Sequence, residues 1–364
     1  MTAFREEIEQ MPAALDLLVS YYEGDGRERL RDLRSRLRGA RDLLWAGMGT
    51  SRFAPEAAFP RLRRAGFSCR SADAGEWLHY EEDAPPAADG PADRPAHGSA
   101  DAPAVVLTSQ SGESVEVRRL VEQGRVPPGF IAITNNLDSF LARRAGLALP
   151  LLAGDEAAIS NKTYANTLAL VSLMASALEG DASLAQCFVD LRAASRALRD
   201  ADMEAIAAAA ARLAPASGIA FVGRGPAFVT ARQCALTFME GTRCLASAFT
   251  GGAFNHGPAE LLAQGFRLVV MQAAGRTRAL NASLAARAAG LGADVVLMSA
   301  AAEERIDGVL TVPVPSIAAR PRGQEELFPL LASRVQNLLL DRVAAGRGLE
   351  AGVFRHGTKV TTHE

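Results

Sequence analysis

The chain has 364 residues, of which 49% are hydrophobic and 22% charged, a composition typical of a globular protein with two domains or slightly more. A formal charge of −2 gives no general basic surface, which argues against nucleic acid or an anionic membrane as the main partner. The acidic N-terminus lacks the apolar run of a signal peptide, and no apolar stretch reaches the length of a membrane span, so we expect a cytoplasmic protein.

Lysine is almost absent: Lys162 and Lys359 are the only two lysines among 39 basic residues. Two interpretations stay open, namely codon drift toward arginine, or a need for a primary amine at these positions. Unlike a guanidinium, a primary amine can act as a base, a nucleophile or a Schiff-base former. The four cysteines form no Cys-x-x-Cys pair and lie mostly among apolar neighbours, which predicts buried free thiols rather than disulfides or zinc ligands. They are Cys69, Cys187, Cys234 and Cys244.

The first half of the chain alternates strands and helices. Apolar residues at three- and four-residue steps predict a helical arm over residues 1–30, and a charged amphipathic helix follows over 27–39. Short apolar runs predict buried strands, and an apolar helix closes the unit at 164–178. The strands are residues 43–47, 104–108, 130–134 and 147–151. This alternation predicts a parallel sheet covered by helices on both faces.

The second half repeats this pattern after an alanine-rich helix over 200–214. Residues 219–225 repeat the pattern of a strand and a Gly-x-Gly turn seen at residues 46–49, which indicates an internal duplication. Further apolar segments follow at 267–272, 295–298 and 312–315, and an amphipathic helix ends the unit at 325–345. We therefore expect an α/β fold with two three-layer, doubly wound, flavodoxin-like domains.

The expected boundaries place the domains at 31–185 and 195–345, with a C-terminal tail at 346–364 that closes over the active site. One stretch breaks the first domain: residues 81–103 carry five prolines and no apolar periodicity. This composition is typical of a surface loop or a disordered insertion, in which His97 would be solvated.

Hydroxyl side chains gather where the strand at 104–108 passes into a helix, in residues 109–114, Ser-Gln-Ser-Gly-Glu-Ser. The carboxyl edge of an open parallel sheet is where ligands bind, and exposed backbone N–H groups at a helix start favour a phosphate. The alternative is plain helix capping, with Ser111 as the N-cap and Ser114 as its reciprocal partner. Thr50 and Ser51 follow the neighbouring strand, and two such loops favour a phosphate cradle. Neither a P-loop nor a Gly-x-Gly-x-x-Gly motif is present.

The order of these and later motifs resembles a tandem pair of sugar isomerase (SIS) domains. The later motifs are Ile159-Ser160-Asn161-Lys162-Thr163, Gly223-Arg224-Gly225, Glu240 and Asn255-His256-Gly257-Pro258. Nearly the whole chain is similar to the isomerase half of glucosamine-6-phosphate synthase. Related members of the family are phosphosugar isomerases, amino-sugar-phosphate deaminases and fructosamine-phosphate deglycases.

The resemblance implies a homodimer that binds a sugar phosphate without metal or cofactor. The implied phosphate and sugar ligands are Thr50, Ser51, Ser109, Gln110, Ser111, Ser114 and Ser160. Glu240 matches the glutamate that moves a proton between C1 and C2. His256 matches the histidine that opens the sugar ring from the neighbouring subunit, and Lys359 matches the lysine that forms a Schiff base with the open-chain ketose.

The chemistry of these residue types agrees with those roles. Glu240 follows a helix that opens at Pro226 and precedes Gly241, an expected C-cap, so the helix dipole would raise its pKa toward neutrality. A solvated glutamate at a helix end is the alternative. His256 lies on a tight Gly-Pro turn, where a side chain with an ordinary pKa near 6.5 can give and take a proton. For Lys162 we favour a structural role, tying its loop to a carboxylate, over a catalytic one.

Two departures separate the chain from glucosamine-6-phosphate synthase. Thr2 stands where that enzyme has its catalytic cysteine and the glutaminase domain is missing, so we expect no glutamine-driven synthesis. Thr237 and Met239 stand where that enzyme carries lysines. We therefore expect isomerisation of a hexose or amino-sugar 6-phosphate, with or without deamination. The alternatives are a fructosamine-phosphate deglycase and a non-catalytic phosphosugar-binding regulator, although no helix-turn-helix pattern or basic extension supports the latter.

Overall fold

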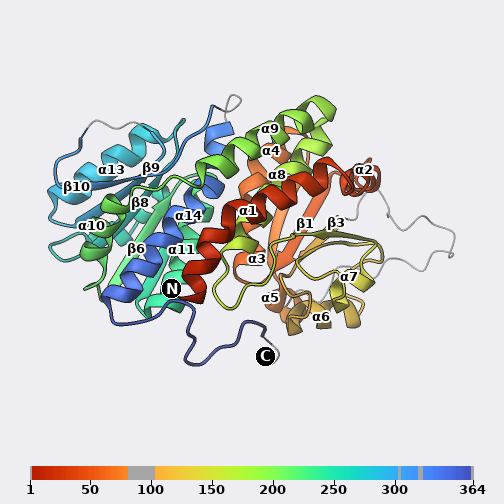
Figure 1. Ribbon diagram of the computed structural model, residues 1–364, viewed down its shortest axis with the longest axis horizontal. Helices are drawn as coiled ribbons and strands as arrows, with labels where there is room; N and C mark the ends of the chain where they lie inside the picture. The colour runs from red at the N-terminus through yellow and green to blue at the C-terminus, as the bar shows by residue number, and fades with distance from the viewer. Residues whose placement is uncertain (1, 81–102, 302–304, 319–322, 362–364) are drawn as a thin grey trace. The chain divides into compact units, whose positions relative to one another are not determined.

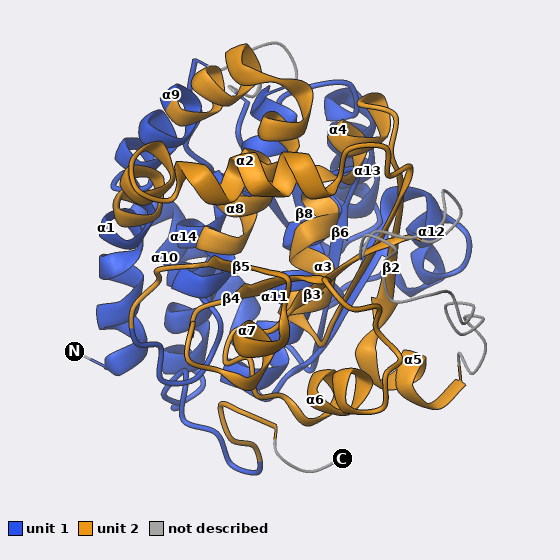
Figure 2. Cartoon of the chain, turned by 90° about the vertical axis from the view of Figure 1, so that its right-hand side faces the viewer, with its two compact units in different colours: residues 1–15, 155–165, 189–356 blue, residues 16–154, 166–188, 357–364 orange. Residues whose placement is uncertain are grey.

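The computed structural model describes residues 2–80, 103–301, 305–318 and 323–361. The predicted insertion, with His97, therefore lies almost entirely outside the described residues. The chain divides into two compact units, each built from separate segments, which Figure 2 shows in different colours. Unit 1 comprises residues 1–15, 155–165 and 189–356, and unit 2 comprises residues 16–154, 166–188 and 357–364.

Unit 2 is built on a five-stranded parallel sheet in the order β2-β1-β3-β4-β5. Figure 1 labels β1 and β3 of this sheet. Its strands are β1 Asp42–Gly47, β2 Ser68–Asp73, β3 Ala104–Thr108, β4 Ile131–Thr134 and β5 Leu147–Pro150. Its helices are α2 Arg27–Arg36, α3 Thr50–Phe53, η1 Ala54–Ala58, α4 Phe59–Arg64, α5 Ala74–Tyr80, α6 Val115–Glu122 and α7 Phe140–Arg144. Three helices contribute residues to both units: α1 Ala3–Glu23, α8 Lys162–Glu179 and α9 Asp181–Ala197.

Unit 1 contains the second five-stranded parallel sheet, in the order β10-β9-β8-β6-β7. Its strands are β6 Gly218–Gly223, β7 Leu245–Thr250, β8 Arg267–Gln272, β9 Asp294–Ser299 and β10 Val309–Pro313. Its helices are α10 Met203–Leu213, α11 Ala227–Thr242, α12 Gly251–Asn255, η2 Pro258–Leu261, α13 Arg278–Gly290 and α14 Gly323–Gly346.

The two sheets share one topology. In each sheet the second strand forms one edge and the first strand lies beside it. The third, fourth and fifth strands follow in that order toward the other edge. This order is the flavodoxin-like arrangement, and the direction of winding reverses between the first and third strands. The predicted α/β fold with two doubly wound sheets is therefore confirmed, and the ligand crevice of each sheet is expected at that reversal.

Buried side chains alternate between the two faces of each sheet, as a doubly covered sheet requires. In unit 2, Val105 and Leu107 pack on the face covered by α5, α6 and α7, whereas Trp45 contacts the ring of Phe59 on α4. In unit 1, residues such as Val222 and Val270 face α12 and α13. On the opposite face the rings of Phe221 and Phe238, from β6 and α11, lie 5.0 Å apart.

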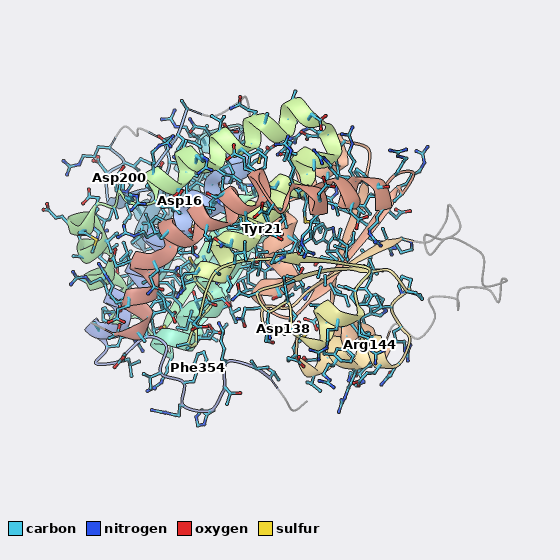
Figure 3. All side chains as sticks on the ribbon, turned by 45° about the vertical axis from the view of Figure 1, so that its right-hand side comes forward. Asp16, Tyr21, Asp138, Arg144, Asp200 and Phe354 are labelled. Atoms are coloured by element: carbon cyan, nitrogen blue, oxygen red, sulfur yellow. The ribbon has the colours of Figure 1, made fainter. Side chains whose placement is uncertain are left out.

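Several contacts fix the ends of the helices around unit 2. The hydroxyl of Tyr22, near the end of α1, donates to the carbonyl oxygen of Pro150 at the end of β5, and its ring meets that of Tyr21 edge to face. Figure 3 labels Tyr21, together with Asp138, two residues before α7, and Arg144, the last residue of α7.

All four cysteines are buried free thiols, as predicted. Among the described helices, none is long and apolar enough to cross a bilayer.

Candidate functional site

The serine-rich loop, residues 109–114, lies where the topology predicts a ligand crevice. It joins β3 to α6 at the carboxyl edge of the unit 2 sheet. The direction of winding reverses between β3 and the neighbouring strand β1. Ser109 is buried, whereas Gln110, Ser111 and Ser114 are partly exposed. The loop therefore presents polar side chains at the point where an open α/β sheet binds its ligand.

The hydroxyls of this loop do not cap the helix. The N-cap of α6 is Ser114 rather than Ser111, and the Ser114 side chain makes no capping hydrogen bond. Its hydroxyl instead pairs with that of Ser109 at 2.9 Å. The Ser111 hydroxyl accepts from the backbone N–H of Glu113 at 3.1 Å. Helix capping with Ser111 as the N-cap, the alternative from the sequence, is thus wrong, and the hydroxyls shape the loop itself.

The path of the loop depends on Gly112. Its φ of +69° lies in the left-handed region, and a Cβ at this position would meet Oγ of Ser139 at 2.1 Å. Its N–H donates to Oγ of Ser109 at 3.1 Å. The carbonyl of Gln110 accepts from Oγ1 of Thr134 at 3.2 Å and from N of Asn135 at 3.0 Å. The loop is therefore held on the end of β4 as well as β3.

Thr50 and Ser51 follow the end of the adjacent strand, β1, as predicted. They form the first turn of α3, which follows β1 through Gly49, whose φ is +49°. A Cβ on Gly47 would lie 2.7 Å from the carbonyl oxygen of Thr108 and 3.1 Å from Cβ of Ser51. Glycine at this position thus allows the end of β3 and the start of α3 to approach closely, which brings the two hydroxyl-bearing loops to neighbouring positions.

The C-terminal tail reaches the same loop. The backbone N–H of Val115, the first residue of α6, donates to the carbonyl oxygen of Thr361 at 3.2 Å. Lys359, two residues earlier, is partly buried, and the hydroxyl of Thr358 donates to the Val360 carbonyl at 2.8 Å. The segment that carries Lys359 therefore lies against the helix that starts directly after the serine-rich loop.

Lys162 belongs to a buried polar network in unit 1. Its ammonium donates to Oε1 of Gln10 at 2.7 Å and to the carbonyl oxygen of Asp155 at 2.5 Å, and the residue is only 3% exposed. The predicted partner, a carboxylate, is wrong: both acceptors are neutral oxygens. Both hydrogen bonds tie the ammonium into the fold, which agrees with a structural role.

The same network fixes the backbone around Ser160. Glu156 accepts from the N–H groups of Asn161 and Thr163 at 2.9 and 3.0 Å. Glu7 accepts from Nδ2 of Asn161 at 2.9 Å. Nε2 of Gln233, a fully buried residue of α11, donates to the carbonyl oxygen of Ser160 at 3.1 Å. Glu7, Glu156 and Gln233 were not predicted from the sequence. The one available signal was a glutamine within the apolar stretch of α11.

Glu240 is partly buried in the last turn of α11, whose N-cap is Pro226 as predicted. The expected C-cap at Gly241 is wrong, because the helix continues to Thr242 and Arg243 ends it with a φ of +54°. Gly241 has a packing role instead. A Cβ there would lie 3.0 Å from Cδ1 of Leu340 on α14 and 3.2 Å from Cδ1 of Ile159.

His256 is exposed and forms the C-cap of α12, directly before Gly257 with its φ of +139°. Because β6 and β7 are parallel, the connecting α11 returns to the amino edge of the sheet, where Glu240 lies. His256 follows the other end of β7, at the carboxyl edge. A six-residue strand spans roughly 17 Å, so one chain places these two residues at opposite edges of the same sheet.

Of the residues predicted to do chemistry, the structure brings together those of unit 2. Thr50, Ser51, the serine-rich loop and the segment of Lys359 gather at the carboxyl edge of its sheet. Ser160, Glu240 and His256 belong to unit 1 and lie on three different elements or loops of it. Among the described residues, no group of histidine, cysteine and carboxylate side chains could hold a metal ion.

Comparison with known proteins connects this geometry to a family. No family model matches the chain. The chain is 28% identical over 272 residues to the glutamine–fructose-6-phosphate aminotransferase (isomerizing) of Aeropyrum pernix. The aligned region covers 71% of this chain and 43% of the relative. It thus spans less than half the length of that relative. The C-terminal domain of the glucosamine-fructose-6-phosphate aminotransferase of Francisella tularensis superposes with a TM-score of 0.80 at 20% identity, covering 95% of this chain and 96% of that domain. The chain is thus similar in sequence to part of the Aeropyrum protein and shares the SIS fold of the Francisella domain.

Another SIS structure widens the comparison. The glucosamine-6-phosphate deaminase of Thermotoga maritima superposes with a TM-score of 0.69 at 17% identity and covers 99% of both chains. The SIS resemblance read from the motif order is therefore confirmed at the level of homology and fold.

Proposed function

We propose that this SIS protein is a phosphosugar isomerase that interconverts the aldose and ketose forms of a hexose or amino-sugar 6-phosphate. The observation that carries the proposal is the arrangement of residues 109–114, whose hydroxyls shape a loop at the reversal point of the unit 2 sheet instead of capping α6. The names of the relatives support the substrate class, since one is an isomerizing fructose-6-phosphate aminotransferase and another is a glucosamine-6-phosphate deaminase.

In the proposed mechanism, the serine-rich loop with Thr50 and Ser51 holds the phosphate, and Ser160 contacts the sugar. His256 moves the proton that opens the ring. Glu240 then removes the proton beside the carbonyl and returns it one carbon away, so one carboxylate serves as base and then as acid. Lys359 supplies the primary amine that can condense with the ketose carbonyl, with loss of water.

The proposed enzyme is a homodimer in which His256 comes from the partner subunit. Glu240 and His256 of one chain lie at opposite edges of the same sheet, so they cannot both contact one hexose within that chain. The exposed position of His256 on a rigid turn leaves it accessible to a second copy.

Deamination of an amino-sugar phosphate is the second candidate reaction, because a deaminase shares the fold over the whole chain. At the two positions where lysines were expected from the resemblance, Thr237 is buried with its hydroxyl bonded to the Gln233 carbonyl, and Met239 is exposed. Neither side chain carries the charged amine of a lysine. Their presence therefore favours isomerisation without glutamine-derived ammonia.

Replacement of Glu240 by Gln tests the proposal. Turnover of fructose 6-phosphate and glucosamine 6-phosphate should fall by about 10²–10⁴-fold, the usual contribution of a positioned acid–base group, while binding of either sugar phosphate persists. Glu204→Gln, on the exposed first turn of α10, is the matched control and should keep full turnover. Unchanged turnover in Glu240→Gln would exclude the proposed role, and binding without any turnover in the native protein would identify a phosphosugar sensor instead.

Mixing two inactive variants tests the shared site. Glu240→Gln and His256→Ala should each be inactive as homodimers. When they are denatured and refolded together, the mixed dimers should regain up to about half the native activity per mixed dimer, because one of their two sites holds both native residues. No recovery in verified mixed dimers would place His256 and Glu240 in the same chain's site.

A further inference from the structure

Unit 1 contains a topological counterpart of the serine-rich loop. In both sheets the third strand in sequence lies beside the first, and a loop at its carboxyl end leads into the following helix. In unit 2 this loop is residues 109–114, between β3 and α6. In unit 1 it is residues 273–277, between β8 and α13. By the same topological rule, the second loop also lies at a position suited to bind an anion.

A carboxylate of the chain itself occupies this second loop. Oε1 of Glu325 accepts a hydrogen bond from the backbone N–H of Arg276 at 2.6 Å, and its Oε2 lies 3.3 Å from Nε of the same arginine. The Glu325 side chain is only 10% exposed, whereas that of Arg276 is 67% exposed. One backbone N–H of the loop and the guanidinium of Arg276 therefore each bind one oxygen of the buried carboxylate.

Gly275 makes room for this carboxylate. A Cβ at Gly275 would lie 2.2 Å from Oε1 of Glu325 and 2.3 Å from its Cδ. Gly275 does not have the left-handed φ that would otherwise require glycine. The absence of a side chain at this position thus serves the close approach of an oxyanion to the backbone, as in loops that hold phosphate.

The surroundings favour a negative charge at this place. Glu325 lies in the first turn of α14, a helix of 24 residues, and the loop that binds it leads directly into α13, a helix of 13 residues. Both helix starts carry positive dipole ends. The unit 1 loop also has Ala273 and Ala274 where the unit 2 loop has hydroxyl and amide side chains, so these two positions offer only backbone groups to an anion.

We propose that residues 273–277 form a second anion site, suited to phosphate, which Glu325 keeps occupied as an internal ligand. The native chain then has one open phosphate site, in unit 2, and one closed site, in unit 1. Removal of the Glu325 carboxylate opens the second site to a free phosphate. The inference rests on contacts within unit 1 and does not require the proposed isomerase activity.

Thermal unfolding with inorganic phosphate tests this inference. Glu325→Ala should gain a rise in Tm of about 2 °C at roughly ten times the dissociation constant of phosphate, beyond the rise shown by Glu326→Ala. Glu326 is the adjacent residue of the same helix turn, so general salt effects and any binding in unit 2 are common to both variants. Glu325→Ser also removes the charge and shortens the side chain, and it should show the same gain if Glu325→Ala does not fold.

A second substitution locates the bound phosphate. Gly275→Ala added to Glu325→Ala should abolish the gain, because its Cβ fills the position of the carboxylate, whereas Gly290→Ala, at the open end of α13, should leave it unchanged. Repeating the measurement with Ser111→Ala separates this site from the unit 2 loop, since the gain should persist there. The inference is overturned if neither Glu325 variant exceeds Glu326→Ala, or if Gly275→Ala leaves the gain intact.

Discussion

Gly112→Ala is the sharpest perturbation of the serine-rich loop, because two independent costs meet at one residue. The backbone φ of +69° disfavours any residue with a Cβ, at about 1–2 kcal/mol. The new Cβ would also lie 2.1 Å from Oγ and 2.4 Å from Cβ of Ser139. Ser139 cannot move freely, since its hydroxyl donates to the Asn136 carbonyl at 2.6 Å and caps α7 through N of Ala142.

The expected loss of stability follows from these two costs. Forcing an extra methyl group into a packed site costs about 1–3 kcal/mol, so Gly112→Ala should lower the free energy of unfolding by about 2–5 kcal/mol. Gly124→Ala is the matched control, because its φ of +67° is nearly the same and a Cβ at Gly124 would meet nothing within 4 Å. The control should lose only the backbone cost, about 1–2 kcal/mol.

Urea unfolding of both variants, followed by sugar-phosphate titration of each, checks this prediction. Gly112→Ala should unfold at a lower urea concentration than Gly124→Ala. It should also bind sugar phosphate more weakly, because the clash with Ser139 displaces the backbone N–H of residue 112 that orients Ser109. Gly124→Ala should bind as the native chain does. Equal stability of the two variants would refute the packing of Gly112 against Ser139, and native binding by Gly112→Ala would refute the role of the loop.

Other predictions concern the rare lysines and the thiols. Lys359→Arg keeps the charge but cannot form a Schiff base, so kcat should fall at least about 10²-fold, and native kcat in this variant would remove Lys359 from the mechanism. Lys162→Met leaves the oxygens of Gln10 and Asp155 without their donor and should cost about 2–4 kcal/mol in urea unfolding; a loss below about 0.5 kcal/mol would contradict the structural role. Burial raises the pKa of Cys69 from 9.0 to about 11. The folded chain therefore holds this proton where the unfolded chain has lost it, so stability is complete below pH 9 and should fall as the pH rises toward 11; in a Cys69→Ala variant that part of the decline should disappear.

Strands with a continuous apolar run were predictable from sequence, including the edge strand β5, and strands without such a run were not. The runs at β3 and β8 are buried on both faces and read as continuous apolar segments, so their predicted bounds match the structure. β2 and β7 escaped prediction because β2 has only two fully buried residues and β7 only one, and polar residues interrupt their apolar ones. Leu245, which begins β7, is 71% exposed.

The candidate site was predictable only where its residues are close in sequence. Residues 109–114 form a motif that the chain brings together locally, and the structure keeps it together. The network around Ser160 depends on Glu7, about 150 positions away, and on Gln233, and no local pattern encodes such pairs. Gly241 shows the converse failure: glycine near a helix end predicted a cap, but close packing against α14 explains it.

Exchange of a carbon-bound proton with solvent tests the isomerase proposal most directly. In deuterium oxide, the native protein should introduce deuterium beside the carbonyl carbon of fructose 6-phosphate or glucosamine 6-phosphate, as observed by proton NMR. Glu240 removes that proton to form an enediol-type intermediate, and the carboxyl group can exchange it for a deuteron before returning it to carbon. Glu240→Gln should bind the sugar without exchange, and Glu204→Gln should exchange as the native protein does. Binding of either sugar phosphate by the native protein without any exchange would contradict the proposed chemistry.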